Sequence, residues 1–223
     1  MGLGRLALAE VSDRWFDLRY GSDTHSPVGL ASLTGTVGDL EHAEPYGPTR
    51  SLALRKLLRT LELAPGRVLV DFGSGKGRIL MVAAPFGFRA VRGVEFSAGL
   101  CEIAQRNIEN FRRRSRVNTE FEVIHADAGA YQVRDDEDVF FVANSFDEQI
   151  MKHVMRNISR SFEANPRPMW LIYRRALYEE CIVRDTPFAK VDTYVFWDSD
   201  FAVFEAGPGQ ARELRASGAP LSV

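Results

Sequence analysis

Cysteine is scarce in this chain of 223 residues, which holds only Cys101 and Cys181. The two lie far apart and outside any Cys-x-x-Cys spacing, so a disulfide scaffold and a cysteine-bound zinc site are both disfavoured. The four histidines show no metal-ligand spacing either, and we therefore expect no metal site. So few thiols are typical of a reducing compartment, and we expect a cytoplasmic protein.

A long apolar run is missing as well. Residues 1–10 lack the apolar core of a signal peptide, and no stretch approaches the ~20 residues that span a membrane. The formal net charge of −2 gives no overall attraction to nucleic acid or to anionic lipid. We therefore expect neither a membrane nor a nucleic acid as the partner.

The composition that remains is ordinary for a globular protein, with 45% hydrophobic and 26% charged residues in a chain long enough for one domain. From residue 68 onwards, short apolar segments alternate with amphipathic ones. Strands are predicted at 68–72, 90–96, 120–125, 139–143, 169–173, 191–197 and 201–204, and helices at 78–85, 98–113 and 147–162. This alternation predicts an α/β fold with a doubly wound, mostly parallel seven-stranded sheet, whose C-terminal hairpin adds an antiparallel strand.

The chain before this pattern is mixed in character. Residues 1–49 are expected to form a helical N-terminal cap or lid, with a short helix over 11–19. A further helix is predicted over 50–63, with Thr49 as its N-cap, because a threonine hydroxyl can accept a hydrogen bond from the first turn. Residues 50–206 would then form the ligand-binding domain, and 207–223, rich in Gly, Ala and Pro, a flexible tail.

A glycine-rich loop, Asp71 to Gly77, connects the first predicted strand to its helix. Glycines there permit positive φ angles and let the backbone approach a ligand closely. In open α/β sheets, ligands bind at the carboxyl ends of the strands, which is where this loop lies. The loop therefore predicts a ligand site, with a tight structural turn as the alternative.

Three kinds of ligand are candidates for this loop. A phosphate-binding P-loop is disfavoured, because Val70 and Gly77 occupy positions where that motif needs a glycine and a serine or threonine. A dinucleotide fingerprint is disfavoured, because the spacing is Gly-x-Gly-x-Gly rather than Gly-x-Gly-x-x-Gly. A nucleoside without pyrophosphate remains. The carboxylate of Asp71 suits a cationic or hydroxyl-bearing ligand and would repel phosphate.

The loop resembles the first motif, Asp/Glu-x-Gly-x-Gly-x-Gly, of class I methyltransferases, which use S-adenosyl-L-methionine (SAM). The positions that match are Asp71, Gly73, Gly75 and Gly77. The resemblance covers residues 46–205 and implies a Rossmann-like fold, SAM as the cofactor and methyl transfer as the activity. It also implies that the protein binds SAM rather than NAD.

Other residues fall where this family places its site. By resemblance, Glu95 after the second strand would bind the ribose hydroxyls, and Phe96 would lie against adenine. Asp127, with Ala128, would read the adenine amino group after the third strand. Asn144 after the fourth strand would bind at the cofactor and face the departing methyl group, where it is a candidate catalytic residue. The alternative for Asn144 is a cap on the helix that follows.

The run Tyr46 to Thr49 resembles a bacterial Tyr-x-Pro-Thr subgroup that is similar to non-SET protein-lysine methyltransferases. The likeness would place Tyr46, a second candidate catalytic residue, and Thr49 near the methionine end of SAM. Lys76 and Arg78 could meet the methionine carboxylate, with solvated side chains as the alternative reading.

The resemblance implies a SAM-dependent methyltransferase that methylates nitrogen on a protein side chain or a small amine. Amine methyltransferases often carry Asn/Asp-Pro-Pro-aromatic after the fourth strand, whereas this chain has Asn144-Ser145-Phe146 without the prolines. Two alternatives stay open. Small-molecule O-methylation would need a base, for which Glu41, His42 and Glu44 are the candidates, and a SAM-binding protein without turnover would keep only the cofactor site.

Overall fold

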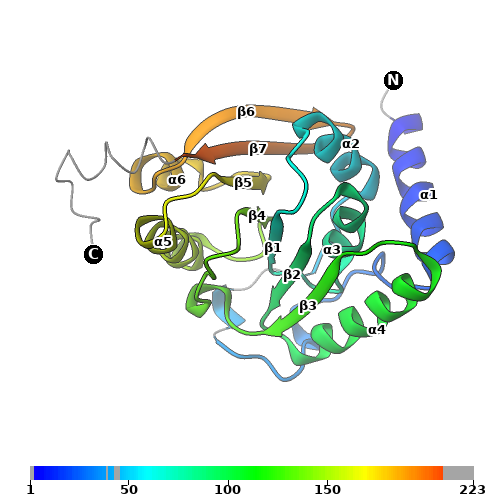
Figure 1. Ribbon diagram of the computed structural model, residues 1–223. Helices are drawn as coiled ribbons and strands as arrows, with labels where there is room; N and C mark the ends of the chain where they lie inside the picture. Colours follow the sequence, from blue (N-terminus) through cyan, green and yellow to red (C-terminus); the bar gives the residue numbers. More distant parts are fainter. Residues whose placement is uncertain (1–2, 39, 43–45, 208–223) are drawn as a thin grey trace.

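The structure of the protein is a computed structural model that describes residues 3–38, 40–42 and 46–207. A seven-stranded sheet with the strand order β3-β2-β1-β4-β5-β7-β6 forms its centre (Figure 1). The strands are β1 (Val68–Phe72), β2 (Ala90–Glu95), β3 (Glu120–His125), β4 (Val139–Val142), β5 (Met169–Arg174), β6 (Ala189–Phe196) and β7 (Ser199–Ala206). The predicted fold class is confirmed.

Strands β1 to β5 run parallel, and the C-terminal hairpin supplies the antiparallel strands. β7 lies between β5 and β6 and is antiparallel to both. The turn between β6 and β7 consists of Trp197 and Asp198, and Trp197 has a positive φ of 57°. Both hairpin strands are longer than the sequence predicted, because β6 begins earlier, at Ala189, and β7 extends over Ser199–Ala206.

Helices cover both faces of the sheet. They are α1 (Leu3–Tyr20), α2 (Ser51–Leu61), α3 (Arg78–Ala83), α4 (Ala98–Arg114), α5 (Glu148–Ala164) and α6 (Glu179–Asp185). Along β4, Val139 and Phe141 join the core under α1 to α4, whereas Phe140 and Val142 join the core under α5 and α6. Side chains of a strand alternate between its faces, so a strand buried on both sides is apolar throughout.

The N-terminal segment is packed into the fold more closely than a loose lid would be. Helix α1 runs over 18 residues rather than only 11–19, and its Phe16 is 1% exposed in the core that α2, α3 and α4 share. Figure 1 shows α1 alongside α4 at the edge of the molecule. The division of the chain at residue 49 stays a prediction, although packing contacts cross it.

One detail of this region was predicted wrongly. Thr49 is not the N-cap of α2, because the helix begins at Ser51 and Arg50 occupies the cap position. The hydrogen bond that a cap would make comes from Asp13 of α1, whose Oδ1 accepts the Ser51 amide at 3.0 Å and the Ser51 hydroxyl at 2.6 Å. A carboxylate at a helix N-terminus also interacts favourably with the helix dipole.

Two further observations concern the limits of the fold. The tail predicted as flexible lies outside the described residues apart from Gly207. Within the described part of the chain, no helix has the length and apolar character needed to cross a bilayer.

Candidate active site

A cavity lies at the carboxyl ends of β1, β2 and β4. The strand order reverses between β1 and β4, and such a switch point is where open α/β sheets bind ligands. The cavity holds about 960 Å³ of empty space, its open mouth included, which suits a ligand of nucleoside size or larger. Of the predicted site residues, those that line it are Tyr46, Thr49, Asp71, Gly73, Glu95, Phe96, Asp127, Ala128 and Asn144.

The glycine loop forms the floor of the cavity, but its glycines do different things. Gly73, Gly75 and Gly77 all have positive φ angles, of 75°, 53° and 80°. A side chain on Gly73 would clash with Ser145, and one on Gly75 would clash with the Tyr46 ring. Gly77 faces Ala104 of α4 instead, with a contact of 3.3 Å to the position of a Cβ atom. Gly75 and Gly77 are therefore set back from the cavity wall and shape the loop from behind.

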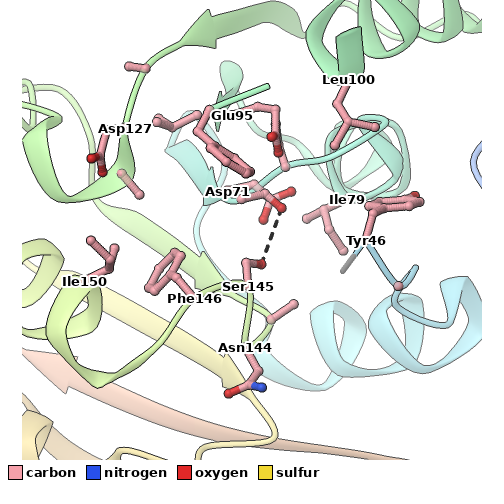
Figure 2. Close-up of a pocket in the computed structure, with 18 of the residues that line it drawn as sticks. Tyr46, Asp71, Ile79, Glu95, Leu100, Asp127, Asn144, Ser145, Phe146 and Ile150 are labelled. Atoms are coloured by element: carbon pink, nitrogen blue, oxygen red, sulfur yellow. Dashed lines mark hydrogen bonds between the residues drawn. The ribbon is translucent and has the colours of Figure 1, made fainter. Parts of the chain in front are cut away.

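Two carboxylates, Asp71 and Glu95, meet in the middle of the site (Figure 2). Asp71 is 1% exposed, and its Oδ2 has no hydrogen-bond partner among the described residues. Burial, with a smaller contribution from Glu95, raises the pKa of the Asp71 carboxyl well above its usual range. Because no described residue donates a hydrogen bond to Oδ2, this oxygen can accept one from a cationic ligand.

Glu95 differs from Asp71 because backbone amides support it. Its Oε2 accepts the Gly75 N–H at 2.8 Å and its Oε1 accepts the Ser97 N–H at 3.0 Å. Burial raises the pKa of Glu95, and these amide bonds oppose the rise. Glu95 therefore links the glycine loop to the end of β2 and keeps lone pairs for a hydroxyl-bearing ligand.

A strap formed by residues 33–38 closes the side of the cavity near β2 and β3, and the sequence did not predict it. The Val37 amide donates to the Phe96 carbonyl at 2.9 Å, and the Ala98 amide donates to the Gly35 carbonyl at 3.1 Å. Asp127 lies on the same side, where its Oδ1 accepts the Gly129 amide at 2.7 Å. The only local signal was the pair Gly35 and Gly38, both with positive φ angles.

Asn144 lies at the end of β4 on the opposite side of the site. It has a positive φ of 54°, and its Oδ1 is buried with no hydrogen-bond partner in the described part of the chain. Figure 2 shows its amide end pointing away from Asp71 and Glu95. Asn144 does not cap α5, because the Asp147 side chain accepts the Ile150 amide there at 3.1 Å. The capping alternative is therefore wrong.

The sequence did not predict that the side chain of the next residue, Ser145, belongs to the site. Its hydroxyl approaches the Gly73 carbonyl at 3.5 Å and covers the glycine loop (Figure 2). Tyr46 covers the same loop from the other side, and its hydroxyl donates to the Thr24 carbonyl at 2.8 Å. Burial raises the pKa of the Tyr46 phenol, so it stays protonated and cannot serve as a base near neutral pH.

The reading of Lys76 and Arg78 as solvated side chains is wrong, because both are buried, and their contact with the methionine carboxylate stays a prediction. Arg78 is 2% exposed, and its Nη1 lies 2.7 Å from Asp13 Oδ1. The Lys76 side chain is 3% exposed, and its Nζ lies 2.9 Å from Asp23 Oδ2. Among the described residues, Nη1 and Nη2 of Arg78 make no well-aligned hydrogen bond. The attraction between Arg78 and Asp13 is therefore mainly one between opposite charges. Only Arg78 reaches the cavity wall.

One of the candidate bases reaches the cavity. His42 lines it, and its Nδ1 lies 2.6 Å from Asp147 Oδ2. His42 and hydrogen bonds to Ile150 and Gln149 lower the pKa of Asp147, although burial opposes the change. Glu41 is not among the residues that line the cavity, and Glu44 lies outside the described residues. Across the ranges that the structure describes, no cluster of three or more His, Cys, Asp or Glu side chains could hold a metal.

This sheet, with a glycine loop after β1 and an acidic residue at the end of β2, defines a class I SAM-dependent methyltransferase. The family model described as "Histone methylation protein DOT1" matches residues 41–162, and the chain belongs to that family. The protein is therefore an enzyme that uses SAM. No curated protein matches the sequence.

Several solved structures similar to this chain are methyltransferases. A ribosomal protein L11 methylase from Lactobacillus delbrueckii subsp. bulgaricus has a TM-score of 0.55 and 12% identity, over 73% of this chain and 81% of its own. An RNA methyltransferase from Salinibacter ruber, in complex with S-adenosyl-L-homocysteine, has a TM-score of 0.53 and 18% identity, over 72% and 94%. A SAM-dependent methyltransferase from Corynebacterium glutamicum has a TM-score of 0.51 and 17% identity, over 70% and 88%. At this identity the likeness concerns the fold.

The residues of the cavity fit SAM. Its ammonium group matches the buried carboxylate of Asp71, which has no hydrogen bond to Oδ2 from any described residue. Its ribose hydroxyls match the remaining lone pairs of Glu95, and the apolar wall near Phe96 suits a purine ring. The orphaned carboxylate is the observation on which this fit rests.

Proposed function

We propose that the enzyme methylates an amine nitrogen on a protein side chain. The observation that carries the proposal is Asn144, a residue of the cavity wall whose buried Oδ1 lacks a partner among the residues described. A buried acceptor without a donor is costly, and an amine N–H from the substrate would satisfy it. Because its amide end points away from Asp71 and Glu95 (Figure 2), we expect the acceptor to approach opposite the carboxylate pair.

The cofactor residues in this proposal are those on the cavity wall. Asp71 would accept the ammonium group of SAM, Glu95 the ribose hydroxyls and Asp127 the adenine amino group. Phe96 and Ala128 would enclose the purine ring. The glycine loop would let the backbone approach the methionine portion.

Tyr46 and Thr49 complete the site at the methionine end. Thr49 is 3% exposed on the cavity wall, and the Tyr46 ring shields the loop at Gly75. In this proposal, both residues lie where the resemblance to the Tyr-x-Pro-Thr subgroup would place them. Tyr46 would exclude water rather than transfer a proton, because its raised pKa keeps it neutral.

The chemistry sets a requirement on the acceptor. SAM supplies a methyl group on a cationic sulfur, so the sulfur–carbon bond breaks with its electron pair left on sulfur while the nitrogen–carbon bond forms. The attacking nitrogen must be neutral, and it releases a proton to solvent after transfer. Burial against an apolar wall lowers the pKa of an ammonium group, and Asn144 would orient the lone pair for attack.

The family description supports a protein as the acceptor, because it names histone methylation. The test is a set of incubations with [methyl-³H]SAM, each with one acceptor: histones, a mixture of small amines, or RNA. Base-stable label in protein, recovered as a methylated amino acid after acid hydrolysis, would support the proposal. Label in the small-molecule or RNA fraction alone would overturn it, and SAM binding without transfer would favour a protein without turnover.

The variant for this test is Asn144→Gly, because glycine tolerates the φ of 54° that alanine would strain. We expect turnover to fall by about 100-fold with SAM affinity little changed, since a positioning contact is lost. The matched control is Asn165→Gly, at the far end of α5. Equal turnover in both variants would remove Asn144 from the reaction.

A second candidate function, small-molecule O-methylation, is favoured by one observation. The His42 imidazole on the cavity wall is paired with Asp147 at 2.6 Å, and such a pair can remove a hydroxyl proton. Catechol-type and carboxylate acceptors with His42→Gln would test it. A loss of turnover that tracks histidine protonation in the pH–rate profile would favour oxygen as the acceptor.

A further inference from the structure

The two basic residues that flank Gly77 are both buried beside the cofactor loop. The side chains of Lys76 and Arg78 are 3% and 2% exposed. Burying a cation is costly unless an anion compensates its charge. Which residues supply those anions therefore affects how the loop binds a charged ligand.

The anions come from the N-terminal segment. Asp13 of α1 pairs with Arg78 at 2.7 Å, and Asp17 Oδ2 lies 3.6 Å from the same guanidinium. Asp23 pairs with Lys76 at 2.9 Å. All three acids precede residue 41, where the match to the family begins. The loop thus depends on charges from outside the region that the family shares.

Hydrogen bonds hold this segment in place against the loop. Asn107 of α4 donates to the carbonyls of both Asp23 and Lys76, at 3.1 and 3.0 Å. Asp17 accepts the Thr24 hydroxyl at 2.7 Å, and the Arg78 Nε donates to that hydroxyl at 2.9 Å. These bonds hold the Asp17 carboxylate and the Asp23 backbone against the loop, whereas the Asp23 side chain itself is 60% exposed.

We propose that Asp13, Asp17 and Asp23 are positioning residues that neutralise Lys76 and Arg78, so that the glycine loop can bind a cationic cofactor. SAM carries a positive charge on sulfur, whereas S-adenosyl-L-homocysteine (SAH) does not. Without the acids, two buried cations beside the cavity would repel SAM more than SAH. The proposal rests on the cofactor-binding role proposed above for this loop.

The experiment is calorimetric titration of SAM and SAH into the full chain and its variants. Asp23→Asn is the main variant, because the Asp23 side chain is 60% exposed and its contacts with Asn107 use the backbone. We expect its ratio of SAM to SAH dissociation constants to rise about threefold to tenfold, because one charge beside the cofactor loop is then uncompensated. Contacts common to both ligands cancel in this ratio, so a purely structural role would not change it.

Two further variants sharpen the test. Asp13→Asn keeps an oxygen for Ser51 but loses the charge opposite Arg78, and we expect the ratio to shift in the same direction. Combining Asp23→Asn with Lys76→Met removes both charges of one pair and should return the ratio to the wild-type value. The matched control is Glu137→Gln, a 0% exposed partner of Arg92 before β4, which should lower the melting temperature without altering the ratio.

The outcomes separate this proposal from the cofactor assignment. If Glu95→Gln leaves the affinity for SAM unchanged, the assignment of the cofactor site fails, and this proposal falls with it. If Glu95→Gln weakens SAM binding but Asp23→Asn leaves the ratio unchanged, only the neutralising role is overturned. A ratio that shifts in Asp23→Asn and is not restored in the double variant would also overturn it.

Discussion

Replacement of Asp71 by asparagine should have opposite effects on stability and on SAM affinity. Asp71 lies next to the last residue of β1 with 1% exposure, and the described residues offer its Oδ2 no hydrogen bond. Ionising it in the ligand-free protein therefore costs free energy, and Asn keeps the shape without the charge. We expect Asp71→Asn to raise the melting temperature of the ligand-free enzyme near neutral pH and to weaken SAM binding.

The loss of affinity follows from the contact that SAM would make. A charged hydrogen bond to a buried carboxylate is worth about 1.5–3 kcal/mol, and about 1.4 kcal/mol is a factor of ten. The dissociation constant should therefore rise roughly 10- to 150-fold. Calorimetry measures this change, and thermal melts with and without SAM measure the gain in stability.

The pH dependence gives a second readout. The pKa of Asp71 in the folded state is raised above its value in the unfolded state, so the folded state binds more protons between these two pKa values. The stability of the wild-type protein therefore falls as the pH rises from the unfolded pKa to the folded pKa. The advantage of Asp71→Asn should thus appear only above the ordinary range of an aspartate. Wild-type affinity for SAM should rise with pH across the same window, because the ionised form binds the cation, while the affinity of the variant should stay flat.

A matched control distinguishes a ligand-binding acid from a structural one. Asp138 also has a pKa raised by burial, but it accepts the Val68 amide at 2.9 Å and pairs with Arg67 at 2.8 Å. Asp138→Asn should lower the melting temperature and leave SAM affinity unchanged. The reasoning about Asp71 would be refuted if Asp71→Asn lowered the melting temperature as Asp138→Asn does, or kept wild-type affinity for SAM.

Two other variants test the same site. Glu95→Gln keeps the side-chain shape but loses the charge, and calorimetry should show SAM binding weakened about tenfold or more. The variant should also lose some stability, because Glu95 accepts hydrogen bonds from two backbone amides. Gly75→Ala would strain a φ of 53° and clash with Tyr46, so both the melting temperature and SAM affinity should fall. Unchanged SAM affinity in Gly75→Ala would mean that the position of the Tyr46 ring does not affect cofactor binding.

The sheet could be predicted closely because local patterns determine it. The bounds of β1 were predicted to the residue, since glycines flank an apolar segment, and those of β3 were predicted to the residue as well, where apolar and polar residues mix. Helix α6 was missed, because Glu179–Asp185 is short and its apolar residues are few. The residues at the strand ends were also predictable, since parallel strands bring their carboxyl ends to one edge of the sheet.

The surroundings of the glycine loop could not be predicted in the same way, because they depend on contacts between distant parts of the sequence. Lys76 and Arg78 read as solvated in isolation, since a lone charge is rarely buried. They are buried because Phe16 anchors α1 in the core and so brings Asp13 to the loop, 65 residues before Arg78 in the chain. The sequence shows that each of these residues is charged, but it does not show which of them pair in the folded protein. The region from residue 41 onward therefore carries the loop without the acids that pair with Lys76 and Arg78, and under the neutralising role proposed above the N-terminal segment is part of the cofactor site.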